Sequence, residues 1–242
     1  MVQEQGIHCA GSDLCQELNG SVETTFALTY EGDPASRRIA ESESLVLIAD
    51  LSPLVVGHLL LLPISHYLSF AGVCKDHSEE LARLLDSVVP KYRKAFGSPV
   101  MLEHGSSSDM NGSACITHAH WHLIPIEGIR VSDIMERDGL EPINLKGHEQ
   151  LAEYATVDRP YYYCSYGTVH TLYFPRRRMR SQYLRSVSGE VLGIDEPLWD
   201  YSLVVRKDYL RETMRLVADW TEVPPQRAGR ASDSEKSERA AE

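Results

Sequence analysis

The sequence predicts an α+β fold in which antiparallel strands pack with one long helix. Two observations carry this prediction. Short apolar and β-branched segments, separated by turns that contain Pro or Gly, dominate the first 128 residues. Residues 76–96 instead repeat Leu and Val at the spacing of one helix face. The composition, with 43% hydrophobic and 24% charged residues, excludes wholesale disorder, a collagen-like repeat and a coiled coil.

The strand pattern begins at residue 25, after a polar stretch of residues 1–20 that is expected to form a loop. A Gly/Ser-rich loop at 105–113 separates the last two strands of this part. The predicted strands are residues 25–30, 38–40, 45–49, 55–62, 100–103 and 115–126.

The long helix has recognisable boundaries in the sequence. Asp76 is the expected N-cap, with Glu79 three residues later, as in a capping box. Pro90 is expected to kink the helix, and Gly97 is expected to end it.

Beyond residue 128 the pattern predicts a C-terminal α/β extension. A hairpin is expected from strands 161–165 and 169–174, turning at Tyr166-Gly167. The predicted short helices are residues 131–137, 148–154, 181–187 and 208–220. Residues 223–242 are predicted to be a disordered tail, because aromatic and large aliphatic side chains are missing after Pro224-Pro225.

Charge and cysteine content restrict the classes of function. The formal net charge of −11 argues against a stable complex with nucleic acid, whose phosphates would be repelled. No apolar run approaches the ~20 residues of a membrane span, and the first residues lack the basic and apolar regions of a signal peptide. A cytoplasmic protein is therefore expected. Five cysteines, an odd number, do not indicate a disulfide framework.

The strongest functional pattern is three alternating histidines, His118, His120 and His122. In a strand they would project from one face, while Trp121 and Leu123 project into a core. Imidazoles gathered in this way suit two chemistries. They can bind zinc or iron, or they can form a nucleophile with supporting imidazoles. The strand alone leaves both readings open.

Further motifs accompany the histidines. Residues 53–66 contain a Gly57-His58 pair and end in His66, and Glu103-His104-Gly105 precedes the Gly/Ser loop. Together with the long helix and the three histidines, this order resembles the histidine triad (HIT) superfamily of nucleotide hydrolases and nucleotidyl transferases. The resemblance covers about residues 9–128. It implies a HIT-like catalytic domain at 1–128, with the extension 129–222 packed on it.

The resemblance implies a role for each histidine. His120 would attack an α-phosphorus to give a covalent nucleotidyl-histidine, with His122, His118 and His58 completing the catalytic cluster. The substrate would be a nucleoside 5′-phosphoryl compound, such as a phosphoanhydride, a phosphoramidate or a nucleotide conjugate. Hydrolysis is favoured over transfer, because relatives specialised for transfer often replace the third histidine with Gln. No cofactor is required for this chemistry.

Three alternatives stay open. They are a nucleotidyltransferase or phosphorylase of the same family, a metal-dependent enzyme that uses the three triad histidines as ligands, and a non-catalytic nucleotide-binding module. Family members are commonly homodimers, although the extension could cover the dimer surface.

The substrate contacts depart from the family pattern. Relatives often carry Gln and then Ser or Thr before the triad, where this chain has Ala114 and Cys115. Serine or Asn side chains of the preceding loop, such as Ser113, are expected to compensate for the missing Gln. We expect Cys115, Ser113 and Glu103 to contact the substrate.

A structural zinc site is a second implication of the resemblance. Some bacterial members hold zinc with two N-terminal cysteines and two histidines, and Cys9, Cys15, His66 and His118 stand in those places. This donor set suits tetrahedral zinc. The spacing of Cys9 and Cys15 is wider than in those members, so two reduced loop cysteines remain the alternative.

The extension contains five arginines within residues 175–185. One interpretation is a phosphate-binding insert that closes over the triad, with Gln182 and Arg185 sharing a helix face and contacting the substrate. On this interpretation Arg185 is partly exposed. The other interpretation is a solvated basic turn that pairs with surface carboxylates.

Overall fold

The computed structural model describes residues 12–107 and 118–220. Three predicted site residues, Cys9, Ser113 and Cys115, lie outside the described residues, and so does the predicted tail 223–242. None of the described helices combines the length and the apolar character that a membrane span needs.

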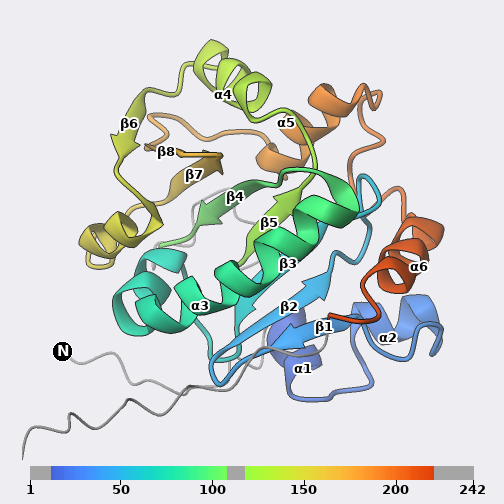
Figure 1. Cartoon of the computed structure of the whole chain (residues 1–242). Helices are drawn as coiled ribbons and strands as arrows, with labels where there is room; N and C mark the ends of the chain where they lie inside the picture. Colours follow the sequence, from blue (N-terminus) through green and yellow to red (C-terminus); the bar gives the residue numbers. More distant parts are fainter. Residues whose placement is uncertain (1–11, 108–117, 221–242) are drawn as a thin grey trace, which may run out of the picture.

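The described chain forms one eight-stranded antiparallel sheet with helices on both faces (Figure 1), which confirms the α+β prediction. The strand order is β1-β2-β3-β5-β4-β7-β8-β6. The strands are β1 (Arg38–Glu41), β2 (Leu45–Ala49), β3 (Leu59–Pro63), β4 (Val100–Gly105), β5 (Trp121–Ile124), β6 (Pro142–Leu145), β7 (Tyr161–Tyr166) and β8 (Val169–Tyr173). The helices are α1 (Asp13–Leu18), α2 (Thr25–Tyr30), α3 (Phe70–Phe96), α4 (Gly128–Arg137), the 3-10 helix η1 (His148–Tyr154), α5 (Tyr183–Leu192) and α6 (Lys207–Leu216).

The sheet runs without a break across residue 128. Strand β4 pairs with β5 on one side and with β7 of the extension on the other. The division into a domain of residues 1–128 and an extension of residues 129–222 therefore stays a prediction about units within one continuous sheet.

One face of the sheet carries the main hydrophobic core. Helix α3 lies across this face (Figure 1), and its Leu84 belongs to the same cluster as Leu59 of β3 and Trp121 of β5. Leu151 of η1 and Leu210 of α6 join this cluster. The first part of the chain and the extension thus share one core.

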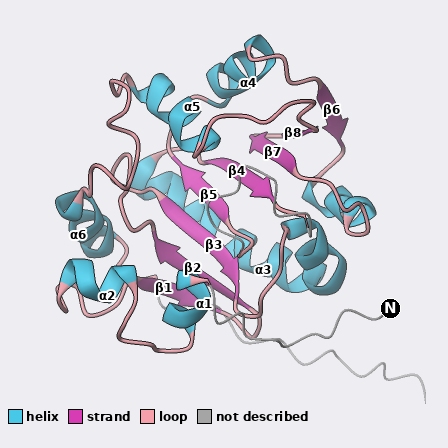
Figure 2. Ribbon diagram, turned by 180° about the vertical axis from the view of Figure 1, so that it is seen from behind, coloured by secondary structure: helices cyan, strands magenta, loops and turns pink. Residues whose placement is uncertain are grey.

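The opposite face carries two smaller clusters. Leu14 of α1 packs with Val46 of β2 and Leu60 of β3. Helices α4 and α5 form the second cluster with β4, β7 and β8, through residues such as Val131 and Val187. Figure 2 shows α1 over one part of the sheet and α4 and α5 over another.

His122 lies between these two clusters. The strand register pairs His122 with Leu60 of the first cluster and with Leu102 of the second. Because side chains alternate along a strand, its neighbour Trp121 points into the main core instead. The His122 side chain therefore lies on the same face as α1, α4 and α5, between their clusters, where it is buried.

The prediction of a strand at residues 25–30 is wrong, because these residues form helix α2. The Thr24 hydroxyl caps this helix by accepting a hydrogen bond from Ala27 N at 3.2 Å. Phe26 and Tyr30 are buried together, whereas Leu28 is 70% exposed. A strand would have placed these three side chains on one face, but the helix turns Leu28 toward solvent and leaves an aromatic pair for the core.

Helix α3 begins at Phe70, earlier than the predicted start at Asp76. The backbone leaves helical geometry at His77 (φ −132°, ψ 28°), and not at Pro90 as predicted. The sequence pattern identified the part of the helix that follows this break. Gly97 ends the helix with φ 98°, as predicted.

Two strands are shorter than predicted. Of the strand predicted at 115–126, the described residues 118–126 contain β5, and His118 and His120 precede it. The strand predicted at 55–62 becomes β3, because His58 N donates to Val55 O at 3.1 Å and closes a turn.

In the extension, the predicted hairpin is confirmed as β7 and β8, and the helix predicted at 131–137 is confirmed as α4. The predicted helices at 181–187 and 208–220 appear as α5 and α6 with shifted ends, and η1 is a 3-10 helix. The sequence did not predict β6 or α1.

Glu103 of β4 is fully buried in the main core and joins three elements. Its carboxylate accepts hydrogen bonds from Phe70 N at 2.6 Å, Tyr161 Oη at 2.8 Å and Trp121 Nε1 at 3.1 Å. Burial raises the pKa of Glu103 to about 7, although the three donors oppose this shift.

We expect Glu103→Gln to remove a pH-dependent part of the stability. A carboxyl whose folded-state pKa is raised stabilises the fold below its unfolded pKa, and this stabilisation is lost as the pH rises through the folded pKa. Relative to the variant, the wild type should therefore lose about 3 kcal/mol of unfolding free energy between pH 4.5 and pH 7. Urea denaturation at several pH values measures this difference. The control is Glu79→Gln, because the Glu79 side chain is 93% exposed. If the difference in unfolding free energy between wild type and Glu103→Gln did not change with pH, the prediction would be contradicted.

Candidate functional site

The partly exposed His120 has one ring nitrogen fixed by the backbone. Its Nδ1 lies 2.8 Å from the carbonyl oxygen of His118. A carbonyl oxygen only accepts hydrogen bonds, so Nδ1 carries the proton and Nε2 keeps its lone pair. The segment itself is held by Ala119 N, which donates to Tyr67 O at 2.7 Å. His120 thus has the tautomer that a nucleophilic imidazole requires.

His58 and His122 form a buried pair beside it. Leu54 N donates to His58 Nδ1 at 3.2 Å, so the proton of this ring is on Nε2. His58 Nε2 then donates to His122 Nδ1 at 2.9 Å. This leaves the proton of His122 on its own Nε2. The rings of His120 and His122 are 4.9 Å apart, edge to face.

Burial keeps these imidazoles neutral. It lowers the pKa of His58 to about 4, even though Asp50 opposes the shift. It also lowers the pKa of His120, and it holds the pKa of His122 well below its ordinary value, with the charges of His120 and His58 adding to the effect. Near neutral pH the site therefore offers an uncharged nucleophile and uncharged hydrogen-bond donors.

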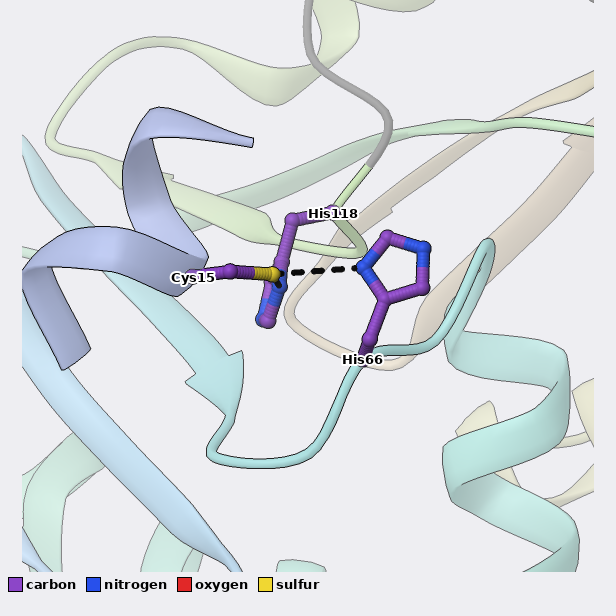
Figure 3. A group of neighbouring side chains, drawn as sticks. All are labelled: Cys15, His66 and His118. Carbon is purple, nitrogen blue, oxygen red and sulfur yellow. Dashed lines mark hydrogen bonds between the residues drawn. The ribbon is translucent and has the colours of Figure 1, made fainter. Parts of the chain in front are cut away.

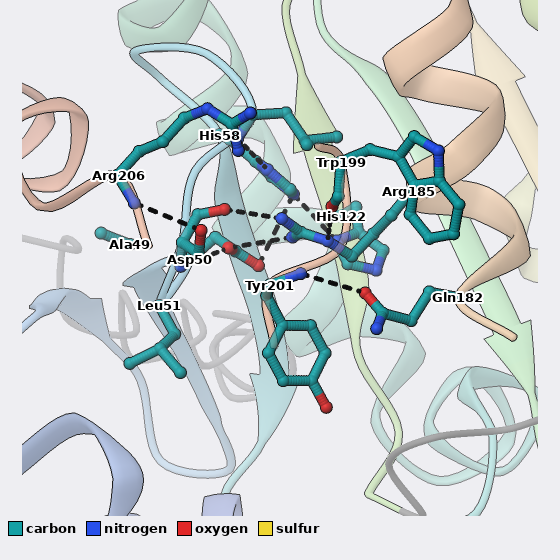
Figure 4. A network of polar contacts seen from close by, with 12 residues as sticks. Ala49, Asp50, Leu51, His58, His122, Gln182, Arg185, Trp199, Tyr201 and Arg206 are labelled. Atoms are coloured by element: carbon teal, nitrogen blue, oxygen red, sulfur yellow. Dashed lines mark hydrogen bonds and ion pairs between the residues drawn. The ribbon is translucent and has the colours of Figure 1, made fainter. Parts of the chain in front are cut away.

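An acidic and a basic side chain lie beside the histidine pair (Figure 4). Asp50 Oδ2 is 3.8 Å from His58 Nε2, and Asp50 Oδ1 accepts a hydrogen bond from Arg185 Nη1 at 3.1 Å. Burial alone would raise the pKa of Asp50, but His58 and Arg185 outweigh burial and hold this pKa well below its usual range. Asp50 is thus a buried carboxylate that keeps its charge.

A second cluster contains Cys15, His66 and His118 (Figure 3). Cys15 Sγ lies 3.0 Å from His118 Nδ1 and 3.4 Å from His66 Nδ1. His118 Nε2 donates to Pro63 O at 2.8 Å, so its Nδ1 lone pair faces the cysteine. Three of the four predicted metal ligands therefore meet, while Cys9 lies outside the described residues.

The three triad histidines do not act as one group. His118 faces Cys15, whereas His122 faces His58. In residues 12–107 and 118–220, no group of candidate metal ligands contains His118, His120 and His122 together. Asp50, His58 and His122 do lie within reach of one another, but the guanidinium of Arg185 already neutralises that carboxylate. The geometry gives no support to a catalytic metal held by the triad.

His104 approaches the site from β4. Its ring lies 4.7 Å from that of Tyr162. Burial, with a contribution from the charge of His120, lowers the pKa of His104 to about 4. The Glu103-His104-Gly105 motif is thus part of a strand.

Two other predicted substrate ligands, Glu103 and Gln182, form hydrogen bonds with protein groups. Glu103 points into the main core, where its donors are main-chain and aromatic groups. Gln182 precedes α5 with φ 51° and donates to Asp200 Oδ1 at 2.6 Å. Because Gln182 has left-handed backbone geometry, it does not share a helix face with Arg185, and that expectation is wrong.

The exposure predicted for Arg185 is also wrong. Arg185 is only 6% exposed, since its helix packs against the segment after β2. By contrast, the side chain of Arg176 is 73% exposed and pairs with Glu141 on the surface. The arginine-rich segment therefore combines a buried arginine with a solvated one. Neither a phosphate-binding insert nor a solvated basic turn describes the whole segment.

Asp50 is the residue of this site that sequence analysis missed. A signal was present, because a carboxylate directly follows the apolar run of β2 and precedes the Gly57-His58 pair. A charged side chain at the end of a fully buried strand needs a partner. The partner, Arg185, is too far along the chain to be found from local pattern.

Comparisons with known proteins give one family match and two relatives in sequence, each similar to part of this chain. Residues 25–136 match the family described as "Protein similar to CwfJ C-terminal". An uncharacterized HIT-like protein of Mycoplasma genitalium is 23% identical over 109 residues, which cover 45% of this chain and 77% of that protein. The "Protein hit" of Bacillus subtilis is 26% identical over 106 residues, which cover 43% and 70%.

Solved structures also match, at low structural similarity. A zinc-bound histidine triad family protein from Mycobacterium smegmatis is 23% identical and covers 44% of this chain and 76% of its own, with a TM-score of 0.31. A Hit-like protein from Bartonella henselae is 20% identical and covers 56% and 98%, with a TM-score of 0.32. These scores are too low to support an argument about the site. The triad motif, the family match and the two HIT-like relatives in sequence identify this chain as a HIT-like member of the histidine triad superfamily.

Proposed function

We propose that this protein is a nucleotide hydrolase that cleaves nucleoside 5′-phosphoryl compounds through a covalent intermediate on His120. One observation carries the proposal. The carbonyl of His118 holds the proton of His120 on Nδ1, which leaves Nε2 free as a nucleophile. Family membership supports the broader class of nucleotide-related hydrolases and transferases.

In the proposed first step, His120 Nε2 attacks the α-phosphorus and the bond from phosphorus to the leaving group breaks. The adduct is a phosphorylated imidazolium that retains its Nδ1 proton, and the His118 carbonyl stabilises its positive charge. His122 directs its Nε2–H toward phosphoryl oxygen, because His58 occupies its Nδ1. An anionic leaving group departs with the bonding electron pair, and a more basic one takes its proton from solvent.

In the proposed second step, water attacks the same phosphorus and the bond to His120 breaks. The imidazole recovers its Nε2 lone pair, one proton from the water passes to solvent, and a nucleoside monophosphate leaves. A transferase would differ only in the acceptor that replaces water. Hydrolysis is the proposal here, because His122 retains a donor next to the nucleophile.

A panel of nucleoside phosphoanhydrides, phosphoramidates and nucleotide conjugates tests the proposal. Intact mass spectrometry after rapid quenching in alkaline denaturant should show a mass increase of one nucleoside monophosphate minus one water on the protein. Release of free nucleoside monophosphate identifies hydrolysis, whereas its appearance on an added acceptor identifies transfer. Nucleotide binding without adduct or product from any compound would favour a non-catalytic module and would reject the proposal.

We expect His120→Ala to abolish the adduct and to lower turnover by at least about 10³-fold, because no other group replaces the nucleophile. The fold should persist, since this side chain is partly exposed. Quenched-flow kinetics and circular dichroism measure both effects. His170→Ala is the matched control, because His170 lies on β8 and bonds Tyr163. Near-normal turnover in His120→Ala would exclude the covalent route.

We also propose a structural zinc ion at Cys15, His66 and His118. The donors suit the ion, since one thiolate and two imidazoles belong to the preferred set. His118 has the outer hydrogen bond typical of a zinc ligand, because its Nε2 donates to Pro63 O. Cys9 stays the proposed fourth ligand. Such an ion would tie α1 to the segment before β5 and would take no part in the reaction.

We expect about one zinc per chain in the purified protein, and its loss in Cys15→Ser. Chelation should release zinc and lower the melting temperature of the wild type by several degrees, because binding energy of the ion is folding energy. Atomic emission and thermal denaturation measure these effects. Cys74→Ser is the control, since Cys74 belongs to the main core. Metal-free wild type with the same stability before and after chelation would reject the site.

A further inference from the structure

Arg185 of α5 joins three segments of the chain (Figure 4). Its Nη1 donates to Asp50 Oδ1 at 3.1 Å, its Nη2 to Ser52 O at 2.7 Å and its Nε to Trp199 O at 3.2 Å. The side chain is 6% exposed. All three edges of this guanidinium are therefore directed at protein groups.

The segment that Arg185 holds leads directly to the catalytic histidines. Asp50 Oδ1 also accepts from Ser52 N at 2.8 Å, and Asp50 N donates to His58 O at 3.1 Å. These bonds close the loop from the end of β2 to the start of β3. A displacement of Asp50 would therefore also displace the His58 main chain.

The proton on His58 Nε2 has one acceptor at hydrogen-bond distance, His122 Nδ1 at 2.9 Å. Asp50 Oδ2 lies 3.8 Å away, beyond hydrogen-bond distance, and would become a second acceptor after a small displacement. A charged carboxylate is a stronger acceptor than a neutral imidazole. Arg185 reduces this advantage, because it neutralises Asp50 and binds the carboxylate from the side of Oδ1.

We propose that Arg185 is a positioning residue, which holds Asp50 so that His58 donates its Nε2 proton to His122 and thereby fixes the tautomer of His122. The inference rests on the proposed function, because His122 matters through the reaction at His120. It places a residue of the extension in control of a hydrogen bond between two residues of the histidine motif. Arg185 acts here without touching the substrate.

The first test compares Arg185→Met, Arg185→Lys and the control Arg176→Met, which removes an exposed arginine of the same segment. With the nucleotide that forms the adduct, Arg185→Met should lower kcat by about 10²-fold and leave KM unchanged within a factor of about two. Arg185→Lys retains the charge and should recover part of kcat. Arg176→Met should behave as wild type. An increase in KM with unchanged kcat would make Arg185 a substrate ligand and overturn the proposal.

The second test observes the ring protons directly. The chain has ten histidines, so long-range ¹⁵N–¹H correlation spectra of histidine-labelled protein can report each tautomer. In wild type, His58 and His122 should both carry the proton on Nε2. In Arg185→Met, the His122 signals should show Nδ1 and Nε2 sharing the proton. Wild-type tautomers in this variant would overturn the proposal.

Arg185→Met leaves a buried carboxylate unpaired and can unfold the protein, which a double variant addresses. Arg185→Met with Asp50→Asn removes both charges, and replacing both partners of a buried pair is tolerated far better than removing one. An amide oxygen competes less for the His58 proton, so the double variant should recover the His122 tautomer and part of kcat relative to Arg185→Met. A folded double variant with the same kcat and tautomers as Arg185→Met would contradict the inference.

The two tests separate this inference from the proposed function. If wild type forms no adduct with any nucleotide, the proposed function fails, yet the tautomer spectra still decide whether Arg185 controls the His58–His122 bond. If the adduct forms and the tautomers do not respond to Arg185→Met, only the positioning role fails.

Discussion

The structure depends on main-chain partners that orient three imidazoles, those of His118, His120 and His58. The carbonyl of Pro63 orients His118, the carbonyl of His118 orients His120, and the N–H of Leu54 orients His58. Each bond commits one ring nitrogen and leaves the other for a different task. The free nitrogens face a thiol, the partly exposed side of the site and His122 respectively. Chemically identical side chains thus acquire separate roles from main-chain groups, which substitutions other than proline leave in place.

The placement of the helices explains why the histidine pair lies between two clusters on one face of the sheet. The main core needs continuous cover, and α3, η1 and α6 supply it. On the other face, α1 and the α4–α5 pair bury separate clusters, and His122 stands between a leucine of each. Burial on both sides desolvates the imidazoles and lowers their pKa values, while His120 keeps contact with solvent. The helices that cover this face therefore influence the pKa values of the histidines.

Much of the fold and part of the site could be predicted from local sequence patterns. Alternation identified the histidine motif, and helical spacing found the second part of α3. The failures have physical causes. Thr25–Tyr30 is apolar and β-branched like a strand, but capping by Thr24 and the burial of Phe26 with Tyr30 select a helix. Asp50 and Arg185 meet only through tertiary packing, so no local signal predicts their pairing or the burial of Arg185. The separation of His118 from His122 likewise follows from the positions of α1 and of the loop before β3.

The position of β4 in the middle of the sheet has a consequence for the modularity of this chain. Both edges of β4 are hydrogen-bonded, to β5 and to β7. A fragment that stopped at residue 128 would expose the edge facing β7, and unpaired strand edges of this kind invite association between chains. It would also leave Asp50 buried without its guanidinium. Separating the two parts of the chain would thus remove the pairing of β4 with β7 and the partner of Asp50 at the same time.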